Sequence, residues 1–279
     1  MESVANLVRP HTEAIALIHG KPVVSSDVLL AILPEVRSRL FSISGIESPD
    51  VLRAVRDVVA FLPAGQTWNK TKRQIATLLS PYLGEDGAKE RATLLLRTHT
   101  FQAFATSNWL GAQADEDTTH LQYLATEDDE VRPSHKALNG IVLPKQDPFW
   151  HDHYPPWEEN CRCRTRSMNP DLVAMTKEAD EKRPPEEKQV MEGALLTKLR
   201  EGMLIRGTQT FDVAPDNSPG AYRFHPEHLT ISLEELKNKY DTAVWSRFVD
   251  TAQRTILENG TSLWVWLGGN REILRLGQA

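Results

Sequence analysis

Apolar side chains recur at helical spacing through the first hundred residues of the chain. The stretch Val51 to Leu62 places one every three or four positions, with charged residues on the opposite face, and Ser48-Pro49-Asp50 supplies cap and first-turn chemistry just before it. A second start of this kind, Ser26-Asp27, precedes the apolar run Val28 to Leu33. These stripes are typical of helices packed on a core. The pattern therefore predicts a mainly helical N-terminal half.

Glycines divide the next helical region in two. Residues 68–83 follow the break Gly65-Gln66-Thr67 and end at Gly84 and Gly87. A long helix is then expected from about Ala88 to Ala114.

The centre of the chain changes to the pattern of strands and turns. Residues 120–126 alternate apolar and polar side chains, as a half-buried strand does. Asn139-Gly140 is a turn signal that predicts a hairpin between Ala137-Leu138 and the residues 141–143. Residues 162–166 are expected to return as a strand beside that hairpin. The loop between them is long, rich in proline and aromatic, so it is either functional or tied down internally.

Charge and proline interrupt the pattern at residues 169–188, which we interpret as a linker or as an exposed helix with a hinge. A strand at Met203-Leu204-Ile205, a helix from the capping box at residues 232–235 to about Leu257, and a strand at 262–267 are expected beyond it. The fold class is α+β, with a helical N-terminal half, a small antiparallel hairpin or sheet carrying the long loop, and a smaller α+β C-terminal segment. The expected segments are 1–50, 51–168, 169–188 and 189–279.

Composition narrows the class of protein. The chain has 279 residues, of which 40% are hydrophobic, enough for a buried core. Neither an apolar run long enough to span a membrane nor the charged and apolar start of a signal peptide is present, so we expect a globular protein without a membrane span. The formal charge of −6 argues against nonspecific wrapping of DNA, although Arg162, Arg164 and Arg166 could form a local basic face.

The most unusual stretch runs from Asp128 to Cys163 and contains both cysteines of the chain. Its order is D-D-x-V-R-P-S-H-x-A-L-x-G, then D-P-F-W-x-x-H-Y-P-P, then C-R-C-R. This order resembles the head morphogenesis domain of phage Mu F-like minor capsid proteins. The segment 96–104 also looks like the Arg-Thr-Asn helix that precedes the motif in that family, so the resemblance covers residues 50 to 166.

The resemblance implies a minor head protein of a tailed phage or Mu-like prophage. Its role would be head assembly together with DNA packaging or delivery through the portal. Its partners would be portal and capsid proteins, with packaged DNA as a further candidate, and it would be found in the virion head and in the host bacterial cytoplasm during assembly. The motif positions expected to form a structural network are Arg97, Thr98, Asp128, Asp129, Arg132, His135, Gly140, Asp147, Trp150, Pro155, Pro156 and Arg162.

The charged motif residues allow two interpretations, an active site or a polar network that holds the long loop. Charges taken out of water need partners, and the guanidinium fork pairs well with a carboxylate. We favour the network, in which Arg97 or Arg132 pairs with Asp128, Asp129 or Asp147 and so holds the helix, the hairpin and the loop together.

Cys161, Cys163 and His135 have the ligand types of a zinc site. A fourth ligand would come from a nearby side chain, namely His151, His153 or Glu158. The C-x-C spacing differs from the common C-x-x-C clip, so the alternative is that both thiols are small buried apolar groups. A disulfide over so short a span would be strained, which favours reduced thiols in a cytosolic setting. His135 could also act as a general base, although a histidine beside a turn is more often a structural donor.

The aromatic side chains of the loop could form a lid over the core or an exposed interface. We expect Phe149 and Trp150 to pack inward beside the hairpin. Trp157, next to Glu158-Glu159, is the candidate for the surface.

The common catalytic signatures G-x-x-x-x-G-K-[ST], H-E-x-x-H and G-x-S-x-G are absent from the sequence, so no enzymatic activity is expected. The alternative function is a phage-borne effector or toxin enzyme, nuclease-like, in residues 190–279, because the family's domain is sometimes joined to such modules. Arg206, His225, His228 and Arg247 are the residues that could converge there. A third hypothesis is a zinc-dependent hydrolase built on His135 and the two cysteines.

Overall fold

The computed structural model describes residues 11–21, 23–24, 26, 29, 37–215, 222 and 224–227, and the backbone of two short strands further on. Helices dominate the N-terminal part and small antiparallel sheets follow, which confirms the α+β class. The chain divides into two compact units. One consists of Met1–Thr106 with Pro226–Ala279, and the other is Ser107–His225.

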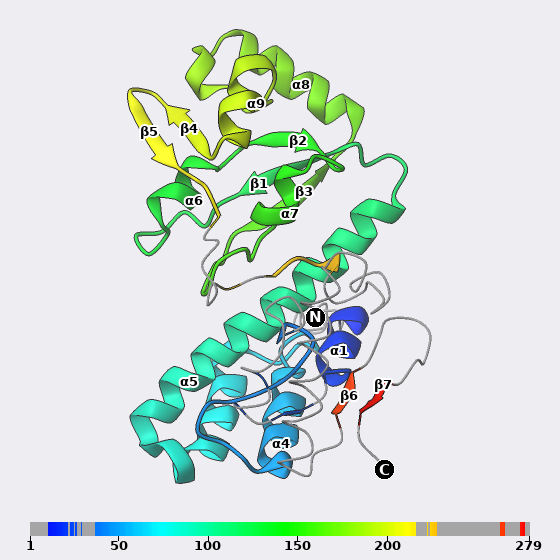
Figure 1. The fold of residues 1–279 in the computed structure, drawn as a ribbon, viewed down its shortest axis with the longest axis vertical. Helices are drawn as coiled ribbons and strands as arrows, with labels where there is room; N and C mark the ends of the chain where they lie inside the picture. Colours follow the sequence, from blue (N-terminus) through cyan, green and yellow to red (C-terminus); the bar gives the residue numbers. More distant parts are fainter. Residues whose placement is uncertain are drawn as a thin grey trace, which may run out of the picture. The chain divides into compact units, whose positions relative to one another are not determined.

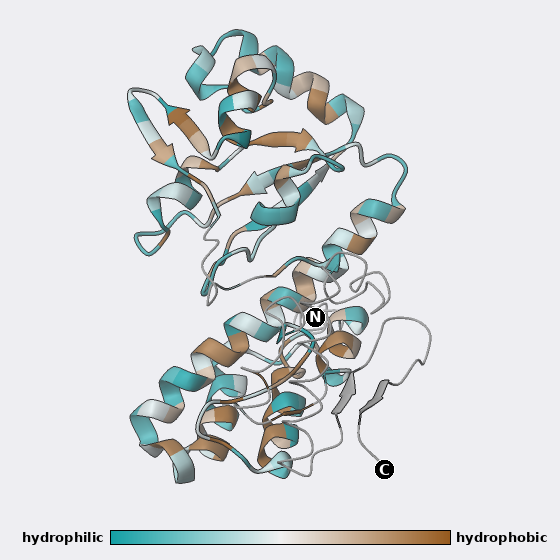
Figure 2. Cartoon of the chain, viewed as in Figure 1, coloured by the Kyte–Doolittle hydropathy of each residue, from teal (hydrophilic) through white to brown (hydrophobic). Residues whose placement is uncertain are grey.

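Helices α1 (Thr12–His19), α4 (Pro49–Val59) and α5 (Trp68–Ala114, as far as Thr106) form the first unit. Helix α4 begins where the sequence predicts. The Ser48 hydroxyl accepts a hydrogen bond from the Val51 amide at 3.5 Å, and Pro49 occupies the first turn. Its apolar stripe is buried and faces the core, while the charged face stays outside (Figure 2).

Helix α5 consists of two helices joined by a kink at Gly84, which has a φ of 70° and a ψ of 170°. A positive φ is open to glycine at little cost, so the chain turns there. The predicted break at Gly84 is confirmed, and the predicted long helix to Ala114 is its second part.

A buried lysine stands out in this unit. The Lys21 ammonium donates to Gln102 Oε1 at 2.8 Å and lies 3.2 Å from His99 Nδ1. Burial lowers the pKa of Lys21 to about 7. Burial, and after it the charge of Lys21, lowers the pKa of His99. At neutral pH the Lys21 amine is therefore only partly protonated, and the His99 ring is neutral.

A three-stranded antiparallel sheet organises the second unit. Strand β1 (His120–Leu124) lies between β2 (Val142–Pro144) and β3 (Arg164–Met168) (Figure 1). The strand predicted at 120–126 is confirmed. The strand predicted at 162–166 is present two residues later, and it pairs with β1.

The predicted hairpin around Asn139-Gly140 is wrong in its first arm. Pro133–Ala137 form a short helix, α6, which ends at Leu138, so β2 pairs with β1 instead. Pro133 sets the φ of a first helical position, and Gly140 (φ 84°) then turns the chain into β2. A Cβ at Gly140 would lie 2.7 Å from Gln189 Nε2, so a larger residue would also displace the end of that side chain.

The two faces of the sheet have different covers. On one face, Val142 and Met168 pack with Val190 and with Val173 of helix α8 (Pro170–Glu181). On the other face, Tyr123 lies opposite Thr165, whose hydroxyl donates to the Tyr154 hydroxyl at 2.9 Å. The second face is therefore covered by the loop that carries the motif and its helix α7 (Phe149–His153).

The segment predicted as a linker or an exposed helix contains α8 and a short 3-10 helix, η2 (Pro185–Glu187). It is attached to the sheet. The buried Asp180 carboxylate accepts from the amides of Gln189 and Val190, both at 2.9 Å, and Val190 bridges to Val142 of β2. The outer edge of β2, which Figure 2 colours as hydrophobic, is thus covered.

Helix α9 (Gly193–Arg200) and the hairpin of β4 (Met203–Arg206) and β5 (Gln209–Asp212) complete the unit, and the predicted strand at 203–205 is confirmed. Figure 1 shows α8 and α9 together, and Lys177 of α8 pairs with Glu192 at the start of α9. In the first unit, β6 (Leu263–Val265) lies within the strand predicted at 262–267 and pairs with β7 (Leu274–Leu276).

The predicted capping box at 232–235 and most of the run Val28 to Leu33 lie outside the described residues. Among the helices of the described ranges, none has the length and apolar character needed to cross a membrane.

Candidate functional site

The motif loop, residues 145–163, forms a lid over the sheet. Its four large aromatic side chains are buried, at exposed fractions of 1% to 5%, and are Phe149, Trp150, Tyr154 and Trp157. Pro155 and Pro156, joined by a cis peptide bond, are buried with them. The expectation that Phe149 and Trp150 pack inward is confirmed. No large aromatic side chain of this loop is left on the surface.

The prediction that Trp157 lies at the surface is wrong. Its indole stacks on the His135 ring with 4.4 Å between ring centroids, and its Nε1 donates to the Tyr123 hydroxyl at 3.0 Å. The adjacent acidic residues suggested exposure, but the chain turns sharply after them. Asn160 has a φ of 62°, which places Cys161 back against the sheet.

His135 and the two cysteines converge beneath this lid. His135 Nδ1 lies 3.5 Å from Cys161 Sγ, 3.6 Å from Cys163 Sγ and 3.4 Å from the Tyr123 hydroxyl. All four side chains are buried. Glu158 Oε2 lies 3.2 Å from the other ring nitrogen, Nε2. The structure thus brings the three predicted metal ligands together, with both sulfurs near one ring nitrogen of the histidine.

Protonation within this cluster is shared. A hydrogen bond from Cys161, followed by one from His135, lowers the pKa of Cys163 to about 4, although burial opposes it. The hydrogen bond between the two thiols, and after it burial, raises the pKa of Cys161. Burial lowers the pKa of His135, but hydrogen bonds to Cys163 and Glu158 outweigh it and the net pKa is raised. Cys163 is therefore the thiol of the pair that loses its proton first.

The other candidate ligands lie elsewhere. His151 is exposed on α7. The ring of His153 is buried, with Nδ1 3.1 Å from the Phe149 carbonyl oxygen and Nε2 2.6 Å from that of Val213. His153 therefore joins the loop to the residue after β5.

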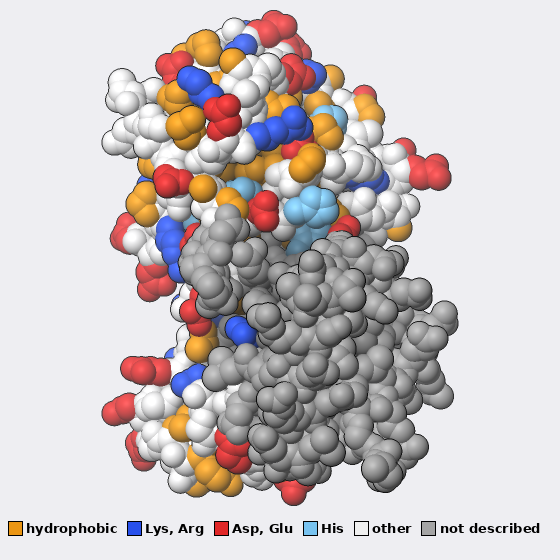
Figure 3. Space-filling view, in the orientation of Figure 1, with side chains coloured by type: hydrophobic (Ala, Val, Ile, Leu, Met, Phe, Trp, Pro, Cys, Tyr) orange, Lys and Arg blue, Asp and Glu red, His pale blue; other side chains and the backbone are white. Residues whose placement is uncertain are grey.

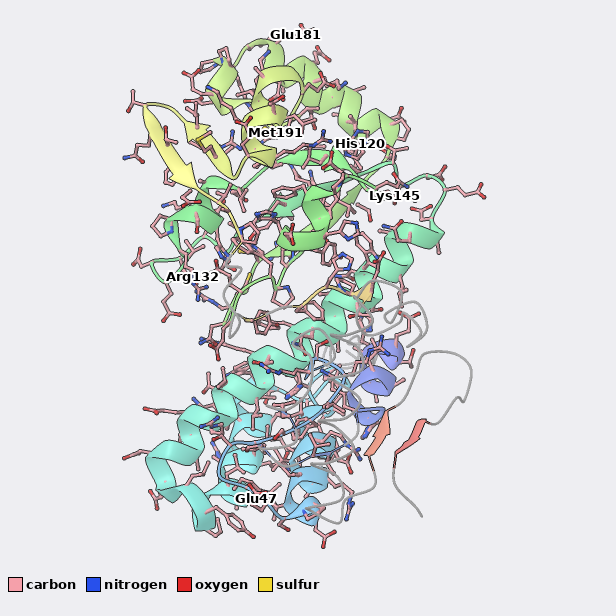
Figure 4. The ribbon with its side chains drawn as sticks, viewed as in Figure 1. Glu47, His120, Arg132, Lys145, Glu181 and Met191 are labelled. Atoms are coloured by element: carbon pink, nitrogen blue, oxygen red, sulfur yellow. The ribbon has the colours of Figure 1, made fainter. Side chains whose placement is uncertain are left out.

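Ion pairs fasten the motif loop and its neighbours, with partners other than those predicted. Arg162 forms a bidentate pair with Asp128, and one of the two contacts measures 2.8 Å. Arg132, labelled in Figure 4, pairs with Glu158 at 3.0 Å and donates to the Glu159 carbonyl at 2.8 Å.

Asp147 likewise pairs with a residue that sequence reasoning did not select, Arg200 of α9, at 2.7 Å. The predicted pairing of Arg132 with these aspartates is wrong, because each arginine reaches the acid that the loop brings closest. Arg97 and Thr98 are half-buried on the part of α5 that belongs to the first unit, and Asp129 is exposed in the second.

The model of a protein family described as "Phage Mu protein F like protein" matches residues 53–166. This chain carries a Mu F-like domain. The match contains the motif loop and the cluster of His135, Cys161 and Cys163. It also contains all three strands of the central sheet except the last residues of β3.

Two relatives agree with the family match. The chain is 28% identical to the "Putative capsid assembly protein F" of Escherichia phage Mu over 179 residues, which are 57% of this chain and 40% of that protein. It is 31% identical to the "Mu-like prophage FluMu F protein" of Haemophilus influenzae over 84 residues, 30% of this chain and 20% of that protein. The chain thus spans less than half the length of these relatives. No solved structure matches it.

Three residues that were not predicted as part of the motif network also hold the Mu F-like domain in place, and each contributes a buried or half-buried charge or hydroxyl. They are Tyr123, Lys145 and Arg206. The alternation of β1 already placed Tyr123 beside Leu121 on one face, so a signal for it existed. Lys145 and Arg206 bind backbone carbonyls distant in sequence, and no local pattern reveals such contacts.

Of the residues proposed for an effector site, those that the structure describes make contacts within the fold. The Arg206 guanidinium donates to the carbonyls of Ala137, Glu186 and Lys188 at 2.9–3.1 Å. His225 is buried with its ring 4.8 Å from that of Trp109. His228 and Arg247 lie outside the described residues.

A cavity of about 450 Å³ opens beside α7, lined by Phe149, His153, Arg200 and neighbouring residues. Both nitrogens of His153 face carbonyl oxygens, so the ring is held rather than free to accept a substrate proton. Arg200 is held by Asp147. The walls of this cavity are therefore fixed by internal contacts of the Mu F-like domain and of the residues that follow it.

Replacing Arg162 with methionine should loosen residues 126–132 without unfolding the domain. The Asp128 carboxylate would lose its bidentate partner, although it would keep the Glu130 amide as a donor. We expect amide hydrogen exchange in this segment to become about two- to tenfold faster. The measurement is exchange followed by mass spectrometry. Arg164→Met, two residues on and exposed, is the matched control, and equal effects of the two variants would contradict the assignment.

Proposed function

We propose that this chain is a minor head protein of a tailed phage or Mu-like prophage and acts in head assembly. The observation that carries the proposal is the similarity over 179 residues to a protein named as a putative capsid assembly protein. The motif loop supports it. Its aromatic side chains are buried and its ion pairs are internal, as suits a rigid surface for contact with other proteins.

We further propose that the protein acts with the portal and capsid proteins in DNA packaging or delivery. Its place would be the virion head, after assembly in the host bacterial cytoplasm. The charge distribution supports protein partners first. On the face drawn in Figure 3, basic and acidic side chains of the second unit are interspersed, and the net charge is −6. Tight binding of DNA without sequence preference requires many phosphate contacts from a basic surface.

Quantitative mass spectrometry of gradient-purified, nuclease-treated particles tests this proposal. The particles come from an induced lysogen, and the copy number of this chain is expressed relative to the portal subunit. We expect a few copies in every particle, and few filled heads from a strain that lacks the gene. A plasmid copy should restore them. Absence from particles combined with a normal yield of filled heads in the deletion strain would overturn the proposal.

A second measurement separates the portal from the capsid as partner. Cross-linking of intact particles with a short lysine-reactive reagent should join this chain to the portal. The exposed Lys136 of α6 and Lys177 of α8 are suitable attachment points in the second unit. Cross-links to the major capsid protein alone would keep the role in head assembly and remove the portal.

A further inference from the structure

Three buried ligand groups from two separate segments face a single point. His135 is on α6, whereas Cys161 and Cys163 immediately precede β3. Their ligand atoms all lie within 4.8 Å of one another. Both sulfurs and the Tyr123 hydroxyl approach the same nitrogen, Nδ1, and Glu158 takes the opposite side of the ring. The ring is therefore already turned with one nitrogen toward the thiols.

The distances match the edges of a tetrahedral zinc site. Zinc lies about 2.0–2.1 Å from a histidine nitrogen and about 2.3 Å from a cysteine sulfur, so the N···S edge of a tetrahedron is about 3.6 Å. The observed edges from His135 Nδ1 are 3.5 Å to Cys161 and 3.6 Å to Cys163. The same geometry places an oxygen ligand about 3.3 Å from the nitrogen. The Tyr123 hydroxyl stands at 3.4 Å.

The surroundings complete the arrangement in the usual way. A zinc-bound histidine commonly presents its other nitrogen to a carboxylate, which fixes the tautomer and the ring orientation. Glu158 lies 3.2 Å from Nε2, and Arg132 holds Glu158 at 3.0 Å. Trp157 covers the ring from one face. Glu158, which the sequence suggested as a fourth ligand, therefore supports the histidine rather than the ion.

We infer that His135 Nδ1, Cys161 Sγ and Cys163 Sγ bind a structural zinc ion, with the Tyr123 hydroxyl at the fourth position. The site is structural because its ligands are closed off from solvent. His135 is 1% exposed, Cys161 3%, Cys163 8% and Tyr123 0%. A catalytic zinc keeps a position open to water or substrate, and this arrangement offers none.

The ion would fasten the C-terminal end of the motif loop. It would join the last residues of the loop, Cys161 and Cys163, to α6 and to the central strand β1, which carries Tyr123. Binding releases to solvent the remaining thiol protons and any proton that His135 Nδ1 carries, so no oxidant or further reactant is required. The expected consequence is a lid whose stability depends on zinc.

Metal content and cobalt spectroscopy on the full chain test this inference. The protein is purified with a reducing agent and without strong chelators, and zinc is measured by inductively coupled plasma mass spectrometry. We expect about one zinc per chain, given how tightly structural zinc is held. Replacement by Co²⁺ should give thiolate-to-cobalt charge-transfer bands and the intense visible bands of tetrahedral cobalt. Less than about 0.2 zinc per chain after incubation with zinc, without those cobalt bands, would overturn the inference.

Variants assign the ligands. Cys161→Ser, Cys163→Ser and His135→Gln should each lower the metal content by more than half, while His120→Gln should not. His120 is a fair control because it lies on the same sheet, is only half-buried and hydrogen-bonds to Thr119. Glu158→Gln should retain the ion with about ten- to a hundredfold weaker affinity. Tyr123→Phe should keep the metal and alter the cobalt bands. If the ligand variants fail to fold, the cobalt spectrum of the unmodified protein decides alone.

Discussion

Replacing Trp150 with alanine should lower the free energy of unfolding of residues 107–225 by about 3–5 kcal/mol. Trp150 is 1% exposed and lies at the centre of the lid, packed edge-on against both Phe149 and Tyr154. Its Nε1 also donates to the Pro144 carbonyl at 2.9 Å, at the end of β2. The substitution therefore opens a large cavity and removes one of the two hydrogen bonds to the Pro144 carbonyl, which keeps the Asp147 amide as a donor.

Urea unfolding, followed by the protection of the β1 amides against hydrogen exchange, measures this effect in the second unit alone. Met175→Ala is the control, because Met175 is 66% exposed on α8 of the same unit. Its effect should stay within about 0.5 kcal/mol. A loss below about 1 kcal/mol for Trp150→Ala would mean that the lid contributes little to the fold.

Replacing Lys145 with methionine should cost the same unit about 2–3 kcal/mol. The Lys145 ammonium donates to the carbonyls of Ala112, Gln113 and Asp115, at 2.9, 3.4 and 3.0 Å, where helix α5 ends. Figure 4 labels it beside the end of that helix. A cation at this end also interacts favourably with the helix dipole. Methionine keeps the volume of the chain, so the loss reports the hydrogen bonds and the charge.

Lys136→Met is the matched control, since Lys136 is exposed on α6. It should change the stability by no more than about 0.5 kcal/mol. The expected pattern for Lys145→Met is a lower urea midpoint with faster amide exchange near residues 111–115. Equal effects of the two variants would show that the capping contact contributes nothing measurable.

Helices were the part of the fold best predicted from sequence, for a local reason. The start of α4 is encoded by Ser48 and Pro49 themselves, and the kink in α5 by Gly84. Strand β1 was predicted because its alternation is local as well. The hairpin failed because Asn139-Gly140 is equally compatible with a turn after a helix, and Pro133 decides between the two. That choice depends on a residue six positions away from the turn signal.

The sequence indicated which residues of the candidate site would meet, but it was a poorer guide to the contacts that they make. His135, Cys161 and Cys163 were expected together, and the structure places them together. The sequence did not reveal that Arg132 pairs with Glu158 or that Asp147 pairs with Arg200. The path of the long loop brings these pairs together, and no local pattern encodes it. Composition near Trp157 suggested exposure, whereas its burial depends on the turn at Asn160. Periodicity gives the face of a regular element and says little about an irregular chain segment.

The covered edge of β2 has a consequence for how this module can be exchanged between proteins. The family match ends at residue 166, but β2 is bridged by Val190, and Arg206 binds carbonyls at 137, 186 and 188. A graft cut at 166 would carry an open, apolar strand edge into its new host, and such edges pair with other chains. The chain segment that can be transferred intact is therefore longer than the family match and extends at least through β5 and Val213.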